Sequence, residues 1–143
     1  MIQLKARYML DRIEGNLLDD EQARHYTEQQ WHALLPDGQA TCGHSFLNLI
    51  VADTDEAVGS AWLFVDSELS SAFIYELFLD EEQRGRGLGR ASLEALETLA
   101  LDQGAATLGL NVFASNTHAR ALYESYGFSA VSTDMIKRLR ATL

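Results

Sequence analysis

Residues 81–92 read EEQRGRGLGRAS, with glycine at positions 85, 87 and 89 and arginine at positions 84, 86 and 90. The apolar residues 72–79 come before this stretch, and a helical pattern over residues 88–101 follows it. A turn between a strand and a helix presents backbone N–H groups at the positive end of the helix dipole. Glycine permits the positive φ angles that such a turn needs. The stretch therefore predicts an anion-binding turn.

The segments on either side of this turn predict an α+β fold. Strand-like segments at residues 46–51, 58–65 and 72–79, separated by polar turns, predict an antiparallel meander. Because a strand, a helix and a strand then follow in order, residues 72–79 and 107–113 should be parallel neighbours. The fold class is thus a mixed, mostly antiparallel sheet flanked by helices. The other expected elements are helices at residues 8–13, 21–35 and 117–126 and a final strand at residues 130–139.

Capping residues and apolar spacing mark the expected helices. Asp19 or Asp20 can cap the helix at residues 21–35, and Gly104 is a plausible stop for the helix at residues 88–101. The buried face of the second of these helices is expected at Leu88, Ala91/Ser92, Ala95/Leu96 and Leu99.

Length and composition indicate one domain, residues 1–143. Hydrophobic residues make up 47% of the chain and charged residues 22%, as in folded globular proteins. No apolar stretch is long enough to span a membrane, and the first five residues lack the layout of a signal peptide. The single cysteine, Cys42, cannot form an internal disulfide. We therefore expect a cytoplasmic protein with no membrane partner.

The charge distribution argues against nucleic acid as a partner. The chain has 11 Lys and Arg against 21 Asp and Glu, a net charge of -10. A molecule with this charge repels polyanions. The arginines at positions 84, 86 and 90 are a local exception and suit a small anionic ligand.

Two common phosphate-binding patterns do not fit residues 84–90. The dinucleotide fingerprint G-x-G-x-x-G requires glycine where Arg90 stands. The P-loop requires four residues between its glycines, followed by lysine and serine or threonine, and this is absent. A plain tight turn with solvated arginines is the alternative to an anion site.

A third pattern does fit. Residues 84–89, Arg-Gly-Arg-Gly-Leu-Gly, resemble the acyl-CoA pyrophosphate loop Q/R-x-x-G-x-G/A of the GCN5-related N-acetyltransferase (GNAT) superfamily. Residues 111–128, NVFASNTHARALYESYGF, resemble the second signature of that family: an Asn, a short helix, Leu-Tyr-Glu and a closing Gly-Phe. The two occur in the family's order, and a looser resemblance extends from Leu35 to Leu139. It implies a GNAT-like acyl-CoA N-acyltransferase fold, acetyl-CoA as co-substrate and no metal.

The resemblance assigns the coenzyme A site to three segments of the chain. The pyrophosphate would lie on the glycine-rich turn, and the pantetheine arm would pair with the strand before it, where a backbone N–H would stabilise the oxyanion. Asn116 matches the family's pantetheine-contacting Asn. The implied binding residues are Leu77, Phe78, Leu79, Arg84, Gly85, Arg86, Gly87, Leu88, Gly89, Arg90, Asn116 and Tyr123.

Two side chains are candidates for proton transfer. Tyr123 matches the family's general acid, which protonates the departing thiolate, and a phenol suits that role. Its alternative role is packing beside Leu122 and Phe128. Glu76 is the only carboxylate inside the strand at residues 72–79 and is the candidate base, acting directly or through water. Its alternative is a surface-facing position.

Other reactive side chains make weaker candidates. Cys42 and His44 could form a thiol–imidazole pair, but such a pair needs a third, orienting group. A small buried cysteine and a turn histidine are the better interpretation. His25 and His32 lie seven apart without an HExxH pattern, so a metal site has little support.

These observations predict an acetyl-CoA-dependent N-acetyltransferase that moves an acetyl group to a primary amine by direct attack in a ternary complex. The acceptor would be a small-molecule or peptide amine, left open because the region before Leu35 is short and in the family forms much of the acceptor pocket. The alternative is a non-catalytic CoA-binding sensor or interaction module. The family often pairs through its C-terminal strands, and the apolar alternation of residues 130–139 favours a homodimer.

Overall fold

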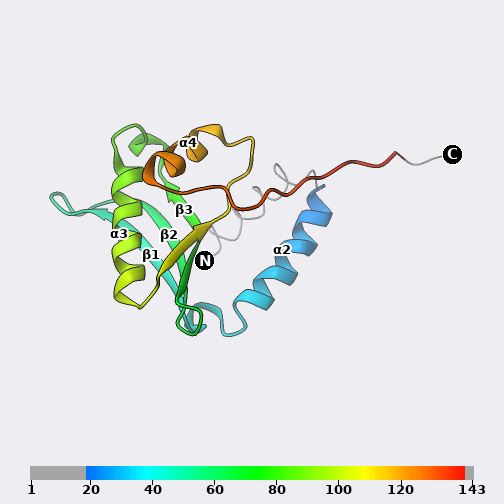
Figure 1. Ribbon diagram of the computed structural model, residues 1–143, viewed down its shortest axis with the longest axis horizontal. Helices are drawn as coiled ribbons and strands as arrows, with labels where there is room; N and C mark the ends of the chain where they lie inside the picture. Colours follow the sequence, from blue (N-terminus) through cyan, green and yellow to red (C-terminus); the bar gives the residue numbers. More distant parts are fainter. Residues whose placement is uncertain (1–18, 141–143) are drawn as a thin grey trace.

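The computed structural model describes residues 19–140, and the helix expected at residues 8–13 lies outside them. In chain order the elements are α2 (Asp20–Leu34), η1 (Gly38–Ala40), β1 (His44–Val51), β2 (Glu56–Asp66), β3 (Ser71–Leu79), η2 (Glu81–Gln83), α3 (Leu88–Asp102), β4 (Thr107–Leu110) and α4 (Thr117–Tyr126) (Figure 1). Each of the α-helices and strands among them falls where the sequence pattern predicts one, whereas the short 3-10 helices η1 and η2 were not predicted.

The four strands form one sheet in the order β1-β2-β3-β4. β1, β2 and β3 are an antiparallel meander, and β4 is parallel to β3 after the crossover through α3. Helix α3 covers one face of the sheet and α2 lies toward the other (Figure 1). The predicted α+β class with a mixed sheet is confirmed.

Helix α2 begins at a capping box and packs on an aromatic cluster. Asp19, one of the two expected caps, accepts a hydrogen bond from the backbone N–H of Gln22 at 2.8 Å, and the Gln22 side chain accepts one in return. At the other end of the helix, Leu35 is buried with Trp62 of β2. Trp31 meets the Trp62 ring edge-on at a centroid distance of 5.3 Å. These contacts attach α2 to the sheet.

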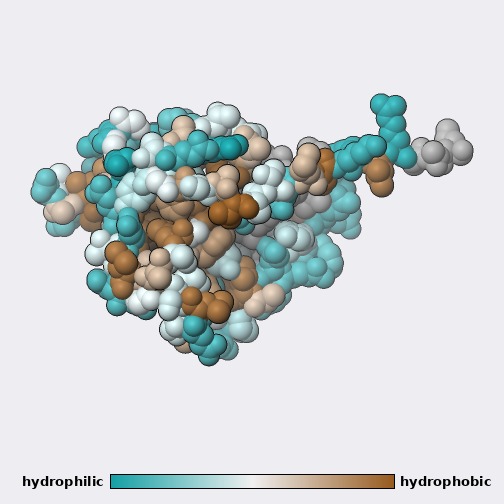
Figure 2. Space-filling model, in the orientation of Figure 1, coloured by the Kyte–Doolittle hydropathy of each residue, from teal (hydrophilic) through white to brown (hydrophobic). Residues whose placement is uncertain are grey.

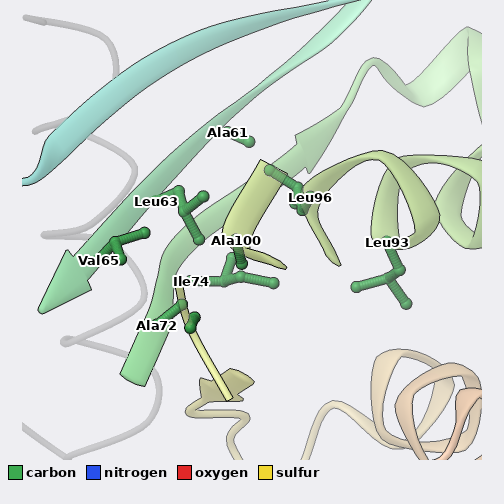
Figure 3. Close-up of a cluster of buried hydrophobic side chains, with 9 residues drawn as sticks. Ala61, Leu63, Val65, Ala72, Ile74, Leu93, Leu96 and Ala100 are labelled. Atoms are coloured by element: carbon green, nitrogen blue, oxygen red, sulfur yellow. The ribbon is translucent and has the colours of Figure 1, made fainter. Parts of the chain in front are cut away.

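The main core lies between the sheet and α3 (Figure 3). From α3 it takes Leu93, Leu96 and Ala100, which meet Ala61, Leu63, Val65, Ala72 and Ile74 of β2 and β3. Of the expected buried face of α3, Ser92 and Leu96 are buried and Leu99 packs against the core, whereas Ala91 and Ala95 are exposed. Leu93, which was not expected on this face, is completely buried. A helix has 3.6 residues per turn, and small alanines give little sequence signal for the edge of its buried stripe.

A β-bulge interrupts β3 halfway along its length. Trp62 of β2 pairs with Glu76, while the next residue, Leu63, pairs with Ile74, so Tyr75 is the extra residue. The burial pattern agrees, because Ile74 belongs to the core under α3 and the next side chain against that core is Leu77, three residues later instead of two. The bulge therefore keeps Glu76 out of the α3 core.

The expected strand at residues 130–139 is wrong for this structure, since no strand is formed there. Val131 is 95% exposed and Met135 93% exposed. The segment runs away from the body of the molecule (Figure 1), and its hydrophobic residues show as brown atoms on the projection (Figure 2). Alternating apolar residues favour a strand only where a neighbouring strand pairs its backbone, and within residues 19–140 none does.

None of the helices in the described part of the chain is long and apolar enough to cross a membrane. The cytoplasmic location stays a prediction from the sequence.

Candidate functional site

The two parallel strands run together only briefly. β4 pairs with Ser71–Ile74 and ends at Leu110, whereas β3 continues beyond the bulge to Leu79. Helix α3 starts and α4 lies at this end of the sheet (Figure 1). In open α/β sheets, ligands commonly bind outside the carboxyl ends of the strands. Leu77, Phe78 and Leu79 all lie in this continuing half of β3.

The glycine-rich turn connects the end of β3 to α3. Gly85 and Gly87 have φ angles of 79° and 76°, in the left-handed region that favours glycine, and Gly87 is the N-cap of α3. Within residues 19–140, the N–H groups of residues 85–90 donate to no backbone carbonyl. The helix has no side-chain cap. The turn therefore offers a set of N–H donors at the positive end of α3.

The three arginines of the turn are each held by a local contact. Arg84 donates from Nε to the carbonyl of Leu79 at 3.3 Å and lies 5.7 Å from the centroid of the Phe78 ring. Arg90 lies 5.3 Å from the centroid of the Tyr126 ring. In the part of the chain that the structure describes, no carboxylate forms an ion pair with any of the three. Their positive charge is therefore not neutralised by an ion pair within residues 19–140.

Tyr123 of α4 lies against the main core and near Glu76. Its ring meets that of Phe128 edge-on at 5.9 Å, so the expected packing contact is present. Burial, and then the negative charge of Glu76, raise the pKa of the Tyr123 phenol above its usual value. Both effects disfavour the phenolate, so the hydroxyl keeps its proton at physiological pH and can donate it.

Glu76 does not face the surface. Its side chain is 9% exposed, on the strand position opposite Trp62, and this excludes the surface-facing alternative. The bulge at Tyr75 produces this position, because it rotates the side-chain alternation just before Glu76. A buried carboxylate whose charge raises the pKa of a partly buried phenol is a candidate pair for proton transfer.

Asn116 has a structural role at the start of α4. Its side-chain oxygen accepts a hydrogen bond from the N–H of Ala119 at 3.2 Å and so caps α4. The helix ends at Gly127, whose φ of 117° requires glycine. These two ends fix the helix that carries Tyr123.

The structure does not bring Cys42 and His44 together with this site. Cys42 is exposed, so the expectation of a buried cysteine is wrong. His44 is the first residue of β1 instead of a turn residue, and its Nδ1 accepts a hydrogen bond from Trp62 Nε1 at 2.9 Å. Burial lowers the pKa of His44. It is thus a neutral member of the aromatic cluster.

The remaining histidines of the sequence analysis lie apart from this site. His25 and His32 are exposed on α2, and Glu28 lies 3.6 Å from His32. Among residues 19–140, no three Asp, Glu, His or Cys side chains are grouped closely enough to hold a metal ion.

Two sets of contacts near the site were not predicted from the sequence. Gln83 is buried and hydrogen-bonds both Glu56 and Arg86. Tyr126 donates a hydrogen bond to Glu97, which, with burial and the charges of Glu97 and Glu94, raises the pKa of Tyr126 to about 12. Gln83 and Glu56 are 27 positions apart, and Tyr126 and Glu97 are 29 apart, spacings that carry no sequence signal.

Known proteins are similar to the part of this chain that contains the glycine-rich turn, Glu76 and Tyr123. The model of the Acetyltransferase (GNAT) family matches residues 8–128. The chain is 35% identical over 129 residues to the uncharacterized N-acetyltransferase YdgE of Bacillus subtilis (strain 168), covering 89% of this chain and 82% of YdgE. It is 36% identical over 114 residues to the [ribosomal protein bS18]-alanine N-acetyltransferase of Escherichia coli (strain K12), covering 77% and 75%. The crystal structure of YycN from Bacillus subtilis superposes with a TM-score of 0.87 at 32% identity, covering 98% of this chain and 90% of YycN.

Proposed function

The chain belongs to the acetyltransferase (GNAT) family and is an N-acetyltransferase, and from this premise we propose that it transfers an acetyl group from acetyl-CoA to a primary amine by direct attack. The observation that carries the proposal is the turn at the start of α3. It combines N–H groups without backbone acceptors and three arginines, in a chain whose net charge is -10. Coenzyme A is an anion that such a site can bind.

In this proposal acetyl-CoA lies beside the half of β3 that continues beyond the end of β4. The pyrophosphate is held by the backbone of Gly85 to Gly89 and by Arg84, Arg86 and Arg90. The pantetheine arm runs beside the continuing half of β3, near Leu77 and Leu79, and passes Asn116. The thioester then lies between β3 and Tyr123. A strand N–H stabilises the oxyanion that forms when the amine attacks.

We assign the two proton transfers to Tyr123 and Glu76. The neutral amine attacks the thioester carbon, and the C–S bond breaks as the tetrahedral intermediate collapses. Tyr123 gives its proton to the leaving thiolate, since its raised pKa keeps the hydroxyl protonated until that step. Glu76, directly or through water, takes the proton that the amine nitrogen loses. Both groups then exchange protons with solvent.

Replacing Glu76 with glutamine tests the base. The amide retains the volume but cannot take a proton, so kcat/KM should fall by about ten- to a hundredfold near neutral pH. The loss should shrink as pH rises toward about 10, where the amine is neutral without help from the protein. A pH profile of kcat/KM for both proteins measures this. If the pH profile of kcat/KM for Glu76→Gln matched that of the unchanged protein, Glu76 would be excluded as the base.

The alternative of a CoA-binding module without turnover predicts the same turn but needs no buried carboxylate whose charge acts on the Tyr123 phenol. The buried position of Glu76 and the effect of its charge on the Tyr123 phenol favour the enzyme. The experiment that decides is an assay of thiol release from acetyl-CoA with polyamines, amino acids, aminoglycosides and peptides as acceptors. Release that depends on one acceptor class supports the proposed function. CoA binding without release from any acceptor would support the binding module.

For the acceptor we propose a primary amine on a small molecule or a peptide. One relative, at 36% identity, is named for the alanine of ribosomal protein bS18, which places a peptide amine among the acceptors to test first. Peptides that begin with alanine and their N-terminally blocked forms make a matched pair in the assay.

We also propose a homodimer that pairs through residues 130–139. Four large apolar side chains of this segment are at least 62% exposed: Val131, Met135, Ile136 and Leu139. Burying them against a second copy removes apolar surface from water. Light scattering should therefore give twice the 15.9 kDa mass of one chain. Replacing Val131 and Met135 with serine should then give the mass of one chain, and a single-chain mass for the unchanged protein over a wide concentration range would contradict the dimer.

A further inference from the structure

Gln83 is the last residue of η2, directly before the glycine-rich turn, and its side chain has two charged neighbours. Its Nε2 donates a hydrogen bond to Oε1 of Glu56 at 2.8 Å, and its Oε1 accepts one from the guanidinium of Arg86. The residue is only 9% exposed. Among the described residues it is the one link between the start of β2 and an arginine of the turn.

The two charges allow only one orientation of the Gln83 amide. A carboxylate only accepts hydrogen bonds and a guanidinium only donates them. The opposite orientation would place oxygen against the Glu56 carboxylate and NH₂ against the Arg86 guanidinium, which loses both bonds. Each bond has one charged partner and is therefore stronger than a neutral one. The amide thus holds Arg86 in a defined direction.

The other end of this chain of contacts is fixed by the sheet. Glu56 is the first residue of β2 and pairs with Val51 of β1. Nearby, the N–H of Asp80 donates to the carbonyl of Val58 at 2.8 Å, and the N–H of Gln83 donates to the carbonyl of Asp80 at 2.8 Å. Backbone and side-chain contacts therefore both anchor η2 to the same end of β2.

We propose that Gln83 is a positioning residue that holds the Arg86 guanidinium toward the phosphates of coenzyme A, using Glu56 as its anchor. The inference rests on the proposed function, because it takes the turn at residues 84–90 as the coenzyme A site. An exposed arginine loses side-chain entropy when it binds a phosphate. A guanidinium that a hydrogen bond already holds in place has lost part of this entropy before the phosphate binds, so it binds the phosphate more tightly. Glu56 accepts the hydrogen bond of the Gln83 amide NH₂, and in the described part of the chain it forms no ion pair with Arg86.

A double-mutant cycle on coenzyme A affinity tests the inference. Gln83→Met keeps the size of the side chain and removes both hydrogen bonds, and it should weaken CoA binding by about three- to tenfold. Arg86→Met should weaken it by about tenfold or more. Because Gln83 acts only through Arg86, the double variant should bind CoA as Arg86→Met does. Calorimetry on the full chain measures all four dissociation constants.

A matched control comes from η2, the short helix that also contains Gln83. Glu81 is an exposed carboxylate in η2 whose side chain makes none of these hydrogen bonds, so Glu81→Gln should leave the dissociation constant unchanged. Additive effects in the cycle would mean that Gln83 acts on the fold and would overturn the inference. Failure of the unchanged protein to bind CoA would overturn the proposed site itself, so the two failures are distinguishable.

A second measurement reads the positioning without any ligand. In the unchanged protein the guanidinium N–H groups of Arg86 should give separate NMR signals, because the hydrogen bond to Gln83 slows rotation. In Gln83→Met they should merge, while those of Arg84 stay as they were. Rotation at Arg86 that is equally fast in both proteins would overturn the inference whatever the CoA affinity.

Discussion

Tyr123→Phe should lower kcat by about ten- to ten-thousandfold, the range for removing a positioned proton donor. The substitution removes one hydroxyl and almost no volume, and the ring contact with Phe128 remains. Folding and CoA affinity should therefore survive. The loss should appear in kcat more than in KM, because protonation of the thiolate stabilises only the transition state. Steady-state kinetics with a responsive acceptor amine give both constants.

The control for this substitution is three residues along the same helix. Tyr126→Phe removes the same hydroxyl, with its hydrogen bond to Glu97, and keeps the ring beneath Arg90. Its kcat should stay close to that of the unchanged protein. If Tyr123→Phe also turned over at the normal rate, water would protonate the thiolate and Tyr123 would be a packing residue.

The raised pKa of Tyr123 also makes the stability of the protein depend on pH. The folded state favours the protonated phenol over the phenolate. The unfolded phenol ionises near its usual value of about 10, while the folded one resists ionisation because of burial and Glu76. Its contribution to stability is therefore fully present below about pH 10 and is lost as the pH rises from there through the folded pKa.

Gly87→Val should weaken coenzyme A binding by about a hundredfold or more, since it disturbs several N–H donors at once. Gly87 has a φ of 76°, which a β-branched residue adopts only with strain. A Cβ at this position meets no protein atom within 4 Å, so the new side chain would project into open space over the turn. We expect that space to hold the pyrophosphate. Calorimetry with CoA measures the loss.

Gly104→Val provides the matched control at the other end of α3. Gly104 also has a positive φ, 91°, and also has open space around a built Cβ. Both substitutions should lower the free energy of unfolding by about 1–3 kcal/mol. Only Gly87→Val should weaken CoA binding. Equal CoA affinity in the two folded variants would place the coenzyme elsewhere.

The order of the elements and the anion-binding turn could be predicted from the sequence alone. Alternation of apolar residues, polar turns and the capping residues around Asp19 and Gly127 are local signals, and they predicted every α-helix and strand of residues 19–140, together with one strand that does not form. The turn at residues 84–90 could be recognised because positive φ angles require glycine at Gly85 and Gly87 themselves. Local conformation is decided by atoms a few residues apart, so local sequence records it.

The tertiary structure decided which side chains meet. The bulge at Tyr75, which turns Glu76 away from the α3 core, depends on how β3 pairs with β2 and has no marker in the apolar run FIYELFL. Gln83 gains its role only because Glu56, 27 positions earlier, lies beside it. The expected strand at residues 130–139 does not form, because an alternating apolar pattern is a local feature, whereas a strand also needs a neighbouring strand to pair with. Contacts between distant residues depend on strand register and helix packing, which are properties of the whole fold.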